Sequence, residues 1–346
     1  MTDTSLQQSE PAVMTGPSLG RIIRHLAGYA ILIAVMLVSP LFVFLPAAIF
    51  HCTIRNGRRI TWIALFIGAV LAGAVVIAGT NSPQINLAEA NMSVAYLVAL
   101  ILAVALPSMA VVPMIERAES FGRVLLVAIL FSAIGLAATE MAMRAGTGFS
   151  PFADQVAGAR VTAAKFMANY QHAGIPPDAI SFLRRWMDVG VYCLPAFLLV
   201  DVVLVFVLSL VLFGRLRTWR DMIERREVNA ASPYLFRNLA LPEWLLFAFV
   251  LGGLSPLASG LTQRVGANVL ALVAFLYLLQ GLAIFRWLLV AVGAGFMGVL
   301  FAYLILGVLT LTGIGPLLLS IAGLFDSFFD FRKFNRKDHS DESHSD

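Results

Sequence analysis

Few residues in this sequence could do chemistry, and the strongest candidate is an aspartate inside an apolar run. Asp201 stands in LLVDVVL (198–204), about thirteen residues, or roughly 20 Å, into a predicted helix. If that helix crosses a membrane, a buried charge costs at least about 2.5–3.5 kcal/mol. Asp201 should therefore face protein or a wet cavity, or stay protonated.

Gln280 stands at a similar predicted depth in a second helix of the same direction, within LLQGLA (278–283). Its amide can donate a hydrogen bond to a carboxylate. Asp201 and Gln280 therefore predict either a polar ligand-binding site or an interhelical hydrogen bond that only fixes packing.

Glu140 and Asn268 complete the candidate ligand-binding residues. Glu140 lies near the outer end of a predicted span, with Arg144 one turn on, and an ion pair between residues i and i+4 explains it most simply. Asn268 lies at a predicted helix start, where capping of the helix is a sufficient explanation.

The sequence lacks the signatures of common membrane enzymes and pumps. It has no glycine loop ending in Gly-Lys-Ser/Thr, no His-Glu-x-x-His and no Gly-x-Ser-x-Gly. His339 and His344 could touch a metal, but a solvated acidic tail is the preferred interpretation. We therefore predict no catalytic residue, no metal site, no cofactor and no enzymatic activity.

The composition predicts that lipid surrounds most of the chain. Of its 346 residues, 60% are apolar and 13% are charged, against about 45–50% and 25% in soluble proteins. The mean hydropathy is +0.87. The basic residues stand at segment ends rather than along one stripe, so we expect no nucleic-acid partner.

The apolar runs predict an all-α fold, a polytopic helical membrane bundle. Six segments are long enough to cross a bilayer: 60–79, 93–113, 123–142, 188–213, 243–261 and 267–287. The stretches 22–53, broken by Pro40 and Pro46, and 288–331, broken by GIGP (313–316), are each predicted to form a helical hairpin. One long kinked span is the alternative for each, which gives about 8–10 membrane helices in all.

Charge predicts the orientation, because cytoplasmic loops carry the excess of Lys and Arg. With both termini inside, 18 of the 24 basic residues are cytoplasmic and six are outside. We therefore predict a bacterial inner-membrane protein with both termini in the cytoplasm. Residues 1–20 and 332–346 are predicted to be disordered tails that flank a membrane domain, 21–331.

Two connections face water. The outer one, 144–187, is predicted to hold a helix after Ser150-Pro151 and a second helix that starts at Pro177 and runs on into the span at 188. This insertion is either a lid over a cavity or a packing or interfacial element. The inner one, 214–242, is basic and could contact anionic lipid or a partner, but an ordinary positive-inside anchor also explains it.

Three stretches in the C-terminal third carry a family resemblance: LPEWL (241–245), NVL with LLQGLA (268–283) and GLFDSFFDFR (323–332). In this order and spacing they resemble the YybS-like family of predicted bacterial membrane proteins. The residues that match its motifs are Trp244, Gln280, Gly281, Asp326, Asp330 and Arg332. The chain departs at Phe285-Arg286-Trp287, where a histidine is common in relatives.

The resemblance implies a distant grouping with the substrate-binding components of energy-coupling-factor transporters, which bind small ligands and have no ATPase of their own. The pair Ala30-x-x-x-Ala34 is similar to the small-residue contact that such components use toward their partner. The stretch from Asp326 to Arg332 suits an interfacial anchor at the cytoplasmic face. The carboxylates of Asp326 and Asp330 would repel each other there unless Arg332 or Lys333 forms an ion pair with them.

Two functions follow as expectations. A small-molecule binding or transport component would have a polar cavity that opens outward near Asp201 and Gln280, beneath residues 150–187. A non-transporting scaffold or regulatory protein would have a filled bundle and act through its cytoplasmic loops. The expected partners are the lipid bilayer, a small-molecule ligand, or a membrane or cytoplasmic protein.

Overall fold

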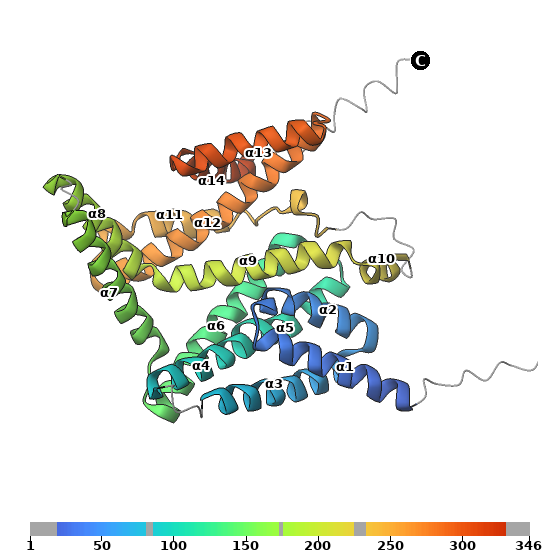
Figure 1. Cartoon of the computed structure of the whole chain (residues 1–346). Coiled ribbons are helices and arrows are strands. Elements are labelled where there is room, and N and C mark those ends of the chain that lie inside the picture. The colour runs from blue at the N-terminus through green and yellow to red at the C-terminus, as the bar shows by residue number, and fades with distance from the viewer. Residues whose placement is uncertain (1–18, 81–85, 173–175, 225–232, 330–346) are drawn as a thin grey trace, which may run out of the picture.

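A computed structural model describes residues 19–80, 86–172, 176–224 and 233–329, and every regular element in them is a helix (Figure 1). The α-helices are α1 (Leu19–Leu37), α2 (Leu45–Asn56), α3 (Arg58–Thr80), α4 (Leu87–Leu100), α5 (Leu106–Glu116), α6 (Phe121–Thr147), α7 (Pro151–His172), α8 (Pro177–Tyr192), α9 (Leu194–Arg215), α10 (Arg217–Glu224), α11 (Leu245–Gly253), α12 (Gly260–Ala291), α13 (Phe296–Leu311) and α14 (Ile314–Phe329). The short helical turns are η1 (Pro40–Phe44), η2 (Ile101–Ala105), η3 (Phe236–Asn238) and η4 (Ser255–Leu257). The all-α fold class is confirmed, and the predicted tails lie outside the described residues apart from Leu19 and Gly20, which begin α1.

Five stretches are long and apolar enough to cross a membrane: Arg58–Thr80, Leu87–Glu116, Phe121–Thr147, Leu194–Arg215 and Gly260–Ala291. They coincide with five of the six predicted spans. The fourth begins at Leu194 rather than at 188, because Pro195 lies in its first turn and the helix breaks at Cys193.

The sixth predicted span, 243–261, is wrong as a full-length helix. α11 has nine residues, about 14 Å of helix, and the turn η4 separates it from α12. Pro242 precedes this helix and Pro256 follows it, so its ends are set by proline. The predicted span therefore consists of a non-helical segment, Leu239–Trp244, followed by a short helix, and we call it the broken crossing.

Each terminal stretch consists of two helices that meet at a sharp bend, and the choice between a hairpin and one bent span stays a prediction. The first bends by 119° between α1 and the η1–α2 segment, and the second bends by 109° between α13 and α14. At the first bend, the Ser39 side chain accepts a hydrogen bond from the Leu41 N–H, just after Pro40. At the second, Gly313 has a φ of +77°, a conformation that side chains disfavour.

The crossing of α4, η2 and α5 is continuous but contains a π-helical turn at Ile101–Ala105. Pro107 follows that turn and cannot donate to a carbonyl one helical turn earlier, so the wider turn accommodates it. α6 packs against the turn at Gly135, where a Cβ atom would lie 2.2 Å from the Leu102 carbonyl oxygen.

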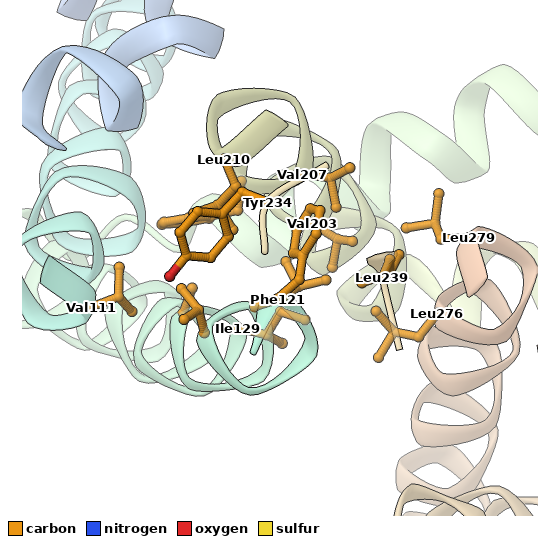
Figure 2. Close-up of a cluster of buried hydrophobic side chains, with 14 of the residues drawn as sticks. Val111, Phe121, Ile129, Val203, Val207, Leu210, Tyr234, Leu239, Leu276 and Leu279 are labelled. Atoms are coloured by element: carbon orange, nitrogen blue, oxygen red, sulfur yellow. The ribbon is translucent and has the colours of Figure 1, made fainter. Parts of the chain in front are cut away.

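The main core joins α5, α6, α9 and α12, as Figure 2 shows. The non-helical chain before α11 also enters it, because Tyr234 and Leu239 are fully buried. The Tyr234 hydroxyl donates to the Glu119 carbonyl oxygen at 3.2 Å. Burial raises the pKa of Tyr234, so the phenol stays a protonated donor.

Small residues let α1 and α3 pack closely together. A Cβ atom on Gly68 would lie 2.9 Å from the Ala30 carbonyl oxygen, and Ala30 is 1% exposed. Ala30 is therefore covered within the chain and is not available to a partner.

The ends of the described chain and the outer insertion lie at opposite ends of the bundle. α1 starts and α14 ends at the right in Figure 1, whereas α7 and α8 lie across the left-hand end. This arrangement agrees with two termini on one side of the membrane. Which side is cytoplasmic stays a prediction, and 225–232 of the basic connection lies outside the described residues.

Candidate functional site

The three stretches that carry the family resemblance meet at one buried point. Gln280 Nε2 donates to Asp326 Oδ2 at 2.9 Å, and the Leu241 N–H donates to Gln280 Oε1 at 3.2 Å. Gln280 and Asp326 are 1% and 6% exposed. One amide therefore serves both a buried carboxylate and the backbone of the broken crossing, and we call Leu241, Gln280 and Asp326 the polar junction.

Glycines let the backbones approach this closely. A Cβ atom on Gly281 would lie 1.9 Å from the Leu319 carbonyl oxygen, and one on Gly323 would lie 2.0 Å from the Tyr277 carbonyl oxygen. Likewise, a Cβ atom on Gly122 of α6 would lie 2.0 Å from the Ala240 carbonyl oxygen. Any side chain at these positions would collide with backbone.

Two hydroxyls lie beside the polar junction, and neither was chosen as a site residue from the sequence. Tyr277 and Ser327 lie next to each other, and among the described residues neither buried oxygen has a well-formed hydrogen bond. Their spacing in the sequence could have indicated this position, because Tyr277 precedes Gln280 by three residues and Ser327 follows Gly323 by four. Such steps place each set on one face of its helix.

The side chain of Asp326 does not face outward as an anchor, because it is buried against Gln280, and the depth of the 326–332 stretch in the membrane stays a prediction. A glutamine of α12 offers the carboxylate a donor, so it does not need the membrane surface. Asp330 and Arg332 lie outside the described residues. Trp244 is 58% exposed, a position that suits a residue at a membrane interface.

The structure does not bring Asp201 and Gln280 together. The Ala196 N–H donates to Asn268 Oδ1, so these two residues lie at the same depth along α9 and α12. Asp201 lies five residues beyond Ala196, whereas Gln280 lies twelve beyond Asn268. Gln280 is therefore about 10 Å deeper, because α9 begins later and α12 begins earlier than the sequence indicated.

Asp201 lies on an open face of α9. It is exposed, as are Phe197, Leu204 and Leu208 at steps of four and three residues along the same side. Tyr96 of α4 lies close enough to interact with it electrostatically. Among the described residues Asp201 forms no ion pair and no hydrogen bond.

Asn268 is not at a helix start; it repairs the break between α8 and α9. Its Oδ1 accepts from the Ala196 N–H at 2.9 Å, and its Nδ2 donates to the Tyr192 carbonyl oxygen at 2.9 Å. In an unbroken helix those two backbone groups would bond to each other. The Arg264 guanidinium lies 5.1 Å from the centre of the Tyr192 ring on the same side.

Glu140 fastens the outer insertion to the bundle. It pairs with Arg144 as predicted, and it also accepts from the Ser150 hydroxyl and, at 3.0 Å, from the Phe152 N–H. A carboxylate at the N-terminus of α7 is favoured by the helix dipole. Glu140 therefore acts as a cap across a tight turn.

The two helices of the insertion, α7 and α8, form a shallow cleft between them. It is lined by Ala159, Thr162, Ala163, Met187, Gly190 and Val191. Neither Asp201 nor Gln280 borders it. No group of three or more His, Cys, Asp or Glu side chains that could hold a metal occurs in the described part of the chain.

Comparison with protein families matches residues 27–327 to a family described as "Predicted membrane protein (DUF2232)". Comparison with curated proteins and with solved structures gave no match. The family match spans most of the chain and includes the broken crossing and the polar junction. The chain therefore belongs to the DUF2232 family of predicted membrane proteins.

Proposed function

We propose that this chain is a non-enzymatic membrane component that assembles with another membrane-spanning protein and does not move a solute through its own bundle. The support comes from its polar residues. Gln280, Asn268 and Glu140, which a ligand would need, are each hydrogen-bonded to other parts of the chain. In the described part of the chain these three side chains hold the fold together and are already engaged with it.

One observation carries the proposal: Asp201 is exposed within a span. It lies seven residues past the start of α9, about 10 Å into the helix, on the face shared by Phe197, Leu204 and Leu208. An unpaired carboxylate in hydrocarbon costs at least about 2.5–3.5 kcal/mol. That cost falls if another protein supplies the missing polar neighbour.

The chemistry of this face selects a membrane helix with one basic side chain. A Lys or Arg at the depth of Asp201 would neutralise the carboxylate and would itself be costly in lipid without it. The surrounding Phe and Leu side chains offer apolar packing to the rest of such a helix. Both partners then gain from the same contact.

The test uses vesicles of phosphatidylcholine that contain the full chain and a fluorescent polyleucine helix with one lysine at the depth of Asp201. We expect energy transfer between them. Asp201→Leu should weaken association about five- to thirty-fold, because interhelical polar contacts in membranes are worth about 1–2 kcal/mol. Phe66→Leu, at an exposed position of α3, is the matched control and should leave association unchanged. Equal association of the wild type and Asp201→Leu would contradict the proposal.

A small-molecule ligand at the broken crossing is the second candidate. Interrupted membrane helices line the substrate sites of many transporters, and here the interruption lies beside the Tyr277 hydroxyl, which lacks a well-formed hydrogen bond. This function would fit the resemblance to energy-coupling-factor components, which stays a prediction. A vitamin that raises the melting temperature of the wild type, but not that of Gln280→Leu, would favour it.

A further inference from the structure

α8 carries an apolar stripe that the described chain leaves uncovered. Phe182, Trp186 and Val189 are 62%, 61% and 48% exposed. They follow one another at steps of four and three residues, so they share one face of the helix. The Phe182 and Trp186 rings pack edge to face with their centroids 6.0 Å apart.

The direction of the stripe follows from its continuation. Cys193, four residues beyond Val189, prolongs the same face and is buried where α8 meets α9. Arg184 and Asp188 are exposed and lie on the roughly opposite face of α8, since successive residues turn by about 100°. The stripe therefore points toward the bundle and its surrounding lipid, and the charged side points away.

The α7–α8 hairpin is held at the end of the spans and lies across them (Figure 1). Glu140 binds the start of α7, and Asn268 binds the last residue of α8. Val189 is only five residues before α9 begins, about 7 Å of helix. These two attachments keep α8 close to the membrane surface.

We propose that α8 is an interfacial helix whose stripe of Phe182, Trp186 and Val189 is inserted into the phospholipid leaflet at this end of the bundle. Amphipathic helices bury their apolar face at the boundary between headgroups and acyl chains, where tryptophan is favoured. Arg185, exposed at the edge of the stripe, is placed to meet a lipid phosphate. The stripe is covered by lipid, and α8 is not a lid over a ligand.

The experiment measures what surrounds each side of α8 in the full chain, reconstituted in vesicles of phosphatidylcholine and phosphatidylglycerol. Spin labels are attached at Phe182→Cys, Trp186→Cys and Val189→Cys on the stripe, and at Arg184→Cys and Asp188→Cys as controls on the same helix. The background carries Cys52→Ala and Cys193→Ala, which removes both native cysteines.

Oxygen concentrates in lipid, and a nickel chelate stays in water. We expect oxygen to relax the three stripe labels several-fold more strongly than nickel does, and the two control labels to show the reverse. Strong nickel relaxation at all five positions would overturn the proposal. So would stripe labels that neither reagent reaches, because a protein would then cover them. The labels at 182 and 189 leave Trp186 in place and decide the matter even if replacing Trp186 perturbs the helix.

Discussion

The main body and the C-terminal hairpin of this protein are held by different means. In the body, α5, α6, α9 and α12 interlock through large buried side chains such as Phe121, Phe206 and Leu276. In the hairpin, α13 has no buried residue. α14 packs along α12 with glycines at the contact, with the hydrogen-bonded pair of Gln280 and Asp326, and with the Ser320 hydroxyl, which donates to the Ala274 carbonyl oxygen at 3.3 Å. The body therefore depends on large apolar side chains, whereas attachment of the hairpin depends on close backbone approach and buried hydrogen bonds.

The largest effect is expected from Gly281→Leu. The new side chain would collide with the Leu319 carbonyl, and overpacking costs about 1–3 kcal/mol or more. We expect α14 to separate from α12, seen as proteolysis after α12 at protease levels that spare the wild type. Gly307→Leu is the control, because nothing lies within 4 Å of a Cβ atom there. A resistant Gly281→Leu protein would remove the contrast between the two regions.

The second-largest loss of stability is expected from Gln280→Leu. It leaves the Leu241 N–H and the Asp326 carboxylate without this partner, and a buried unsatisfied polar group costs about 1–3 kcal/mol. The check is reversible unfolding in mixed micelles. If the pair acts as a unit, Gln280→Leu with Asp326→Leu should cost less than the two single changes added together. Strict additivity would show that the polar junction is not one interaction.

Asn268→Leu tests the body rather than the hairpin. The change leaves the Ala196 N–H and the Tyr192 carbonyl oxygen without the hydrogen bonds to Asn268. The expected loss of unfolding free energy is about 1–2 kcal/mol. Asn268→Asp can accept from the Ala196 N–H, and it can donate to the Tyr192 carbonyl only when its carboxyl group is protonated. Its loss in unfolding free energy should therefore be smaller than that of Asn268→Leu at acidic pH, where both hydrogen bonds can form. Proteolysis of the C-terminal hairpin should not change, and if it did the two regions would be coupled.

Glu140→Ala should have the smallest effect, about 1 kcal/mol, typical of a lost helix cap. The change should loosen α7 and leave the spans intact. Hydrogen exchange of the first turn of α7 would report it, with Glu89→Ala as a control, since Glu89 caps α4 in a similar way. Exchange that rises across α6 and α9 as well would mean that Glu140 supports the body.

The sequence predicted the elements that proline, glycine and hydropathy determine. Pro40 and Gly313 mark the two bends, and continuous apolar runs mark five spans. It failed at α11, because hydropathy measures how apolar a segment is and not whether its backbone is helical. A segment among other helices can be non-helical when its backbone groups find partners, and here Gln280 supplies one for Leu241.

The candidate site could be predicted only in part. Gln280 was singled out by its place in an apolar run and Asp326 by resemblance, but pairing them needed the close approach that Gly281 and Gly323 permit. Asp201 was paired with the wrong residue because the depth of a side chain depends on where its helix begins. An error of a few residues in two helix starts displaced the expected partner by about 10 Å.

The most direct test of the assembly proposal exchanges the charge at residue 201. Full-length Asp201→Lys is placed in phosphatidylcholine vesicles with polyleucine helices that carry either one lysine or one glutamate at matching depth. The account predicts that the wild type associates better with the lysine helix and that the variant associates better with the glutamate helix. An unchanged preference between the two proteins would contradict it.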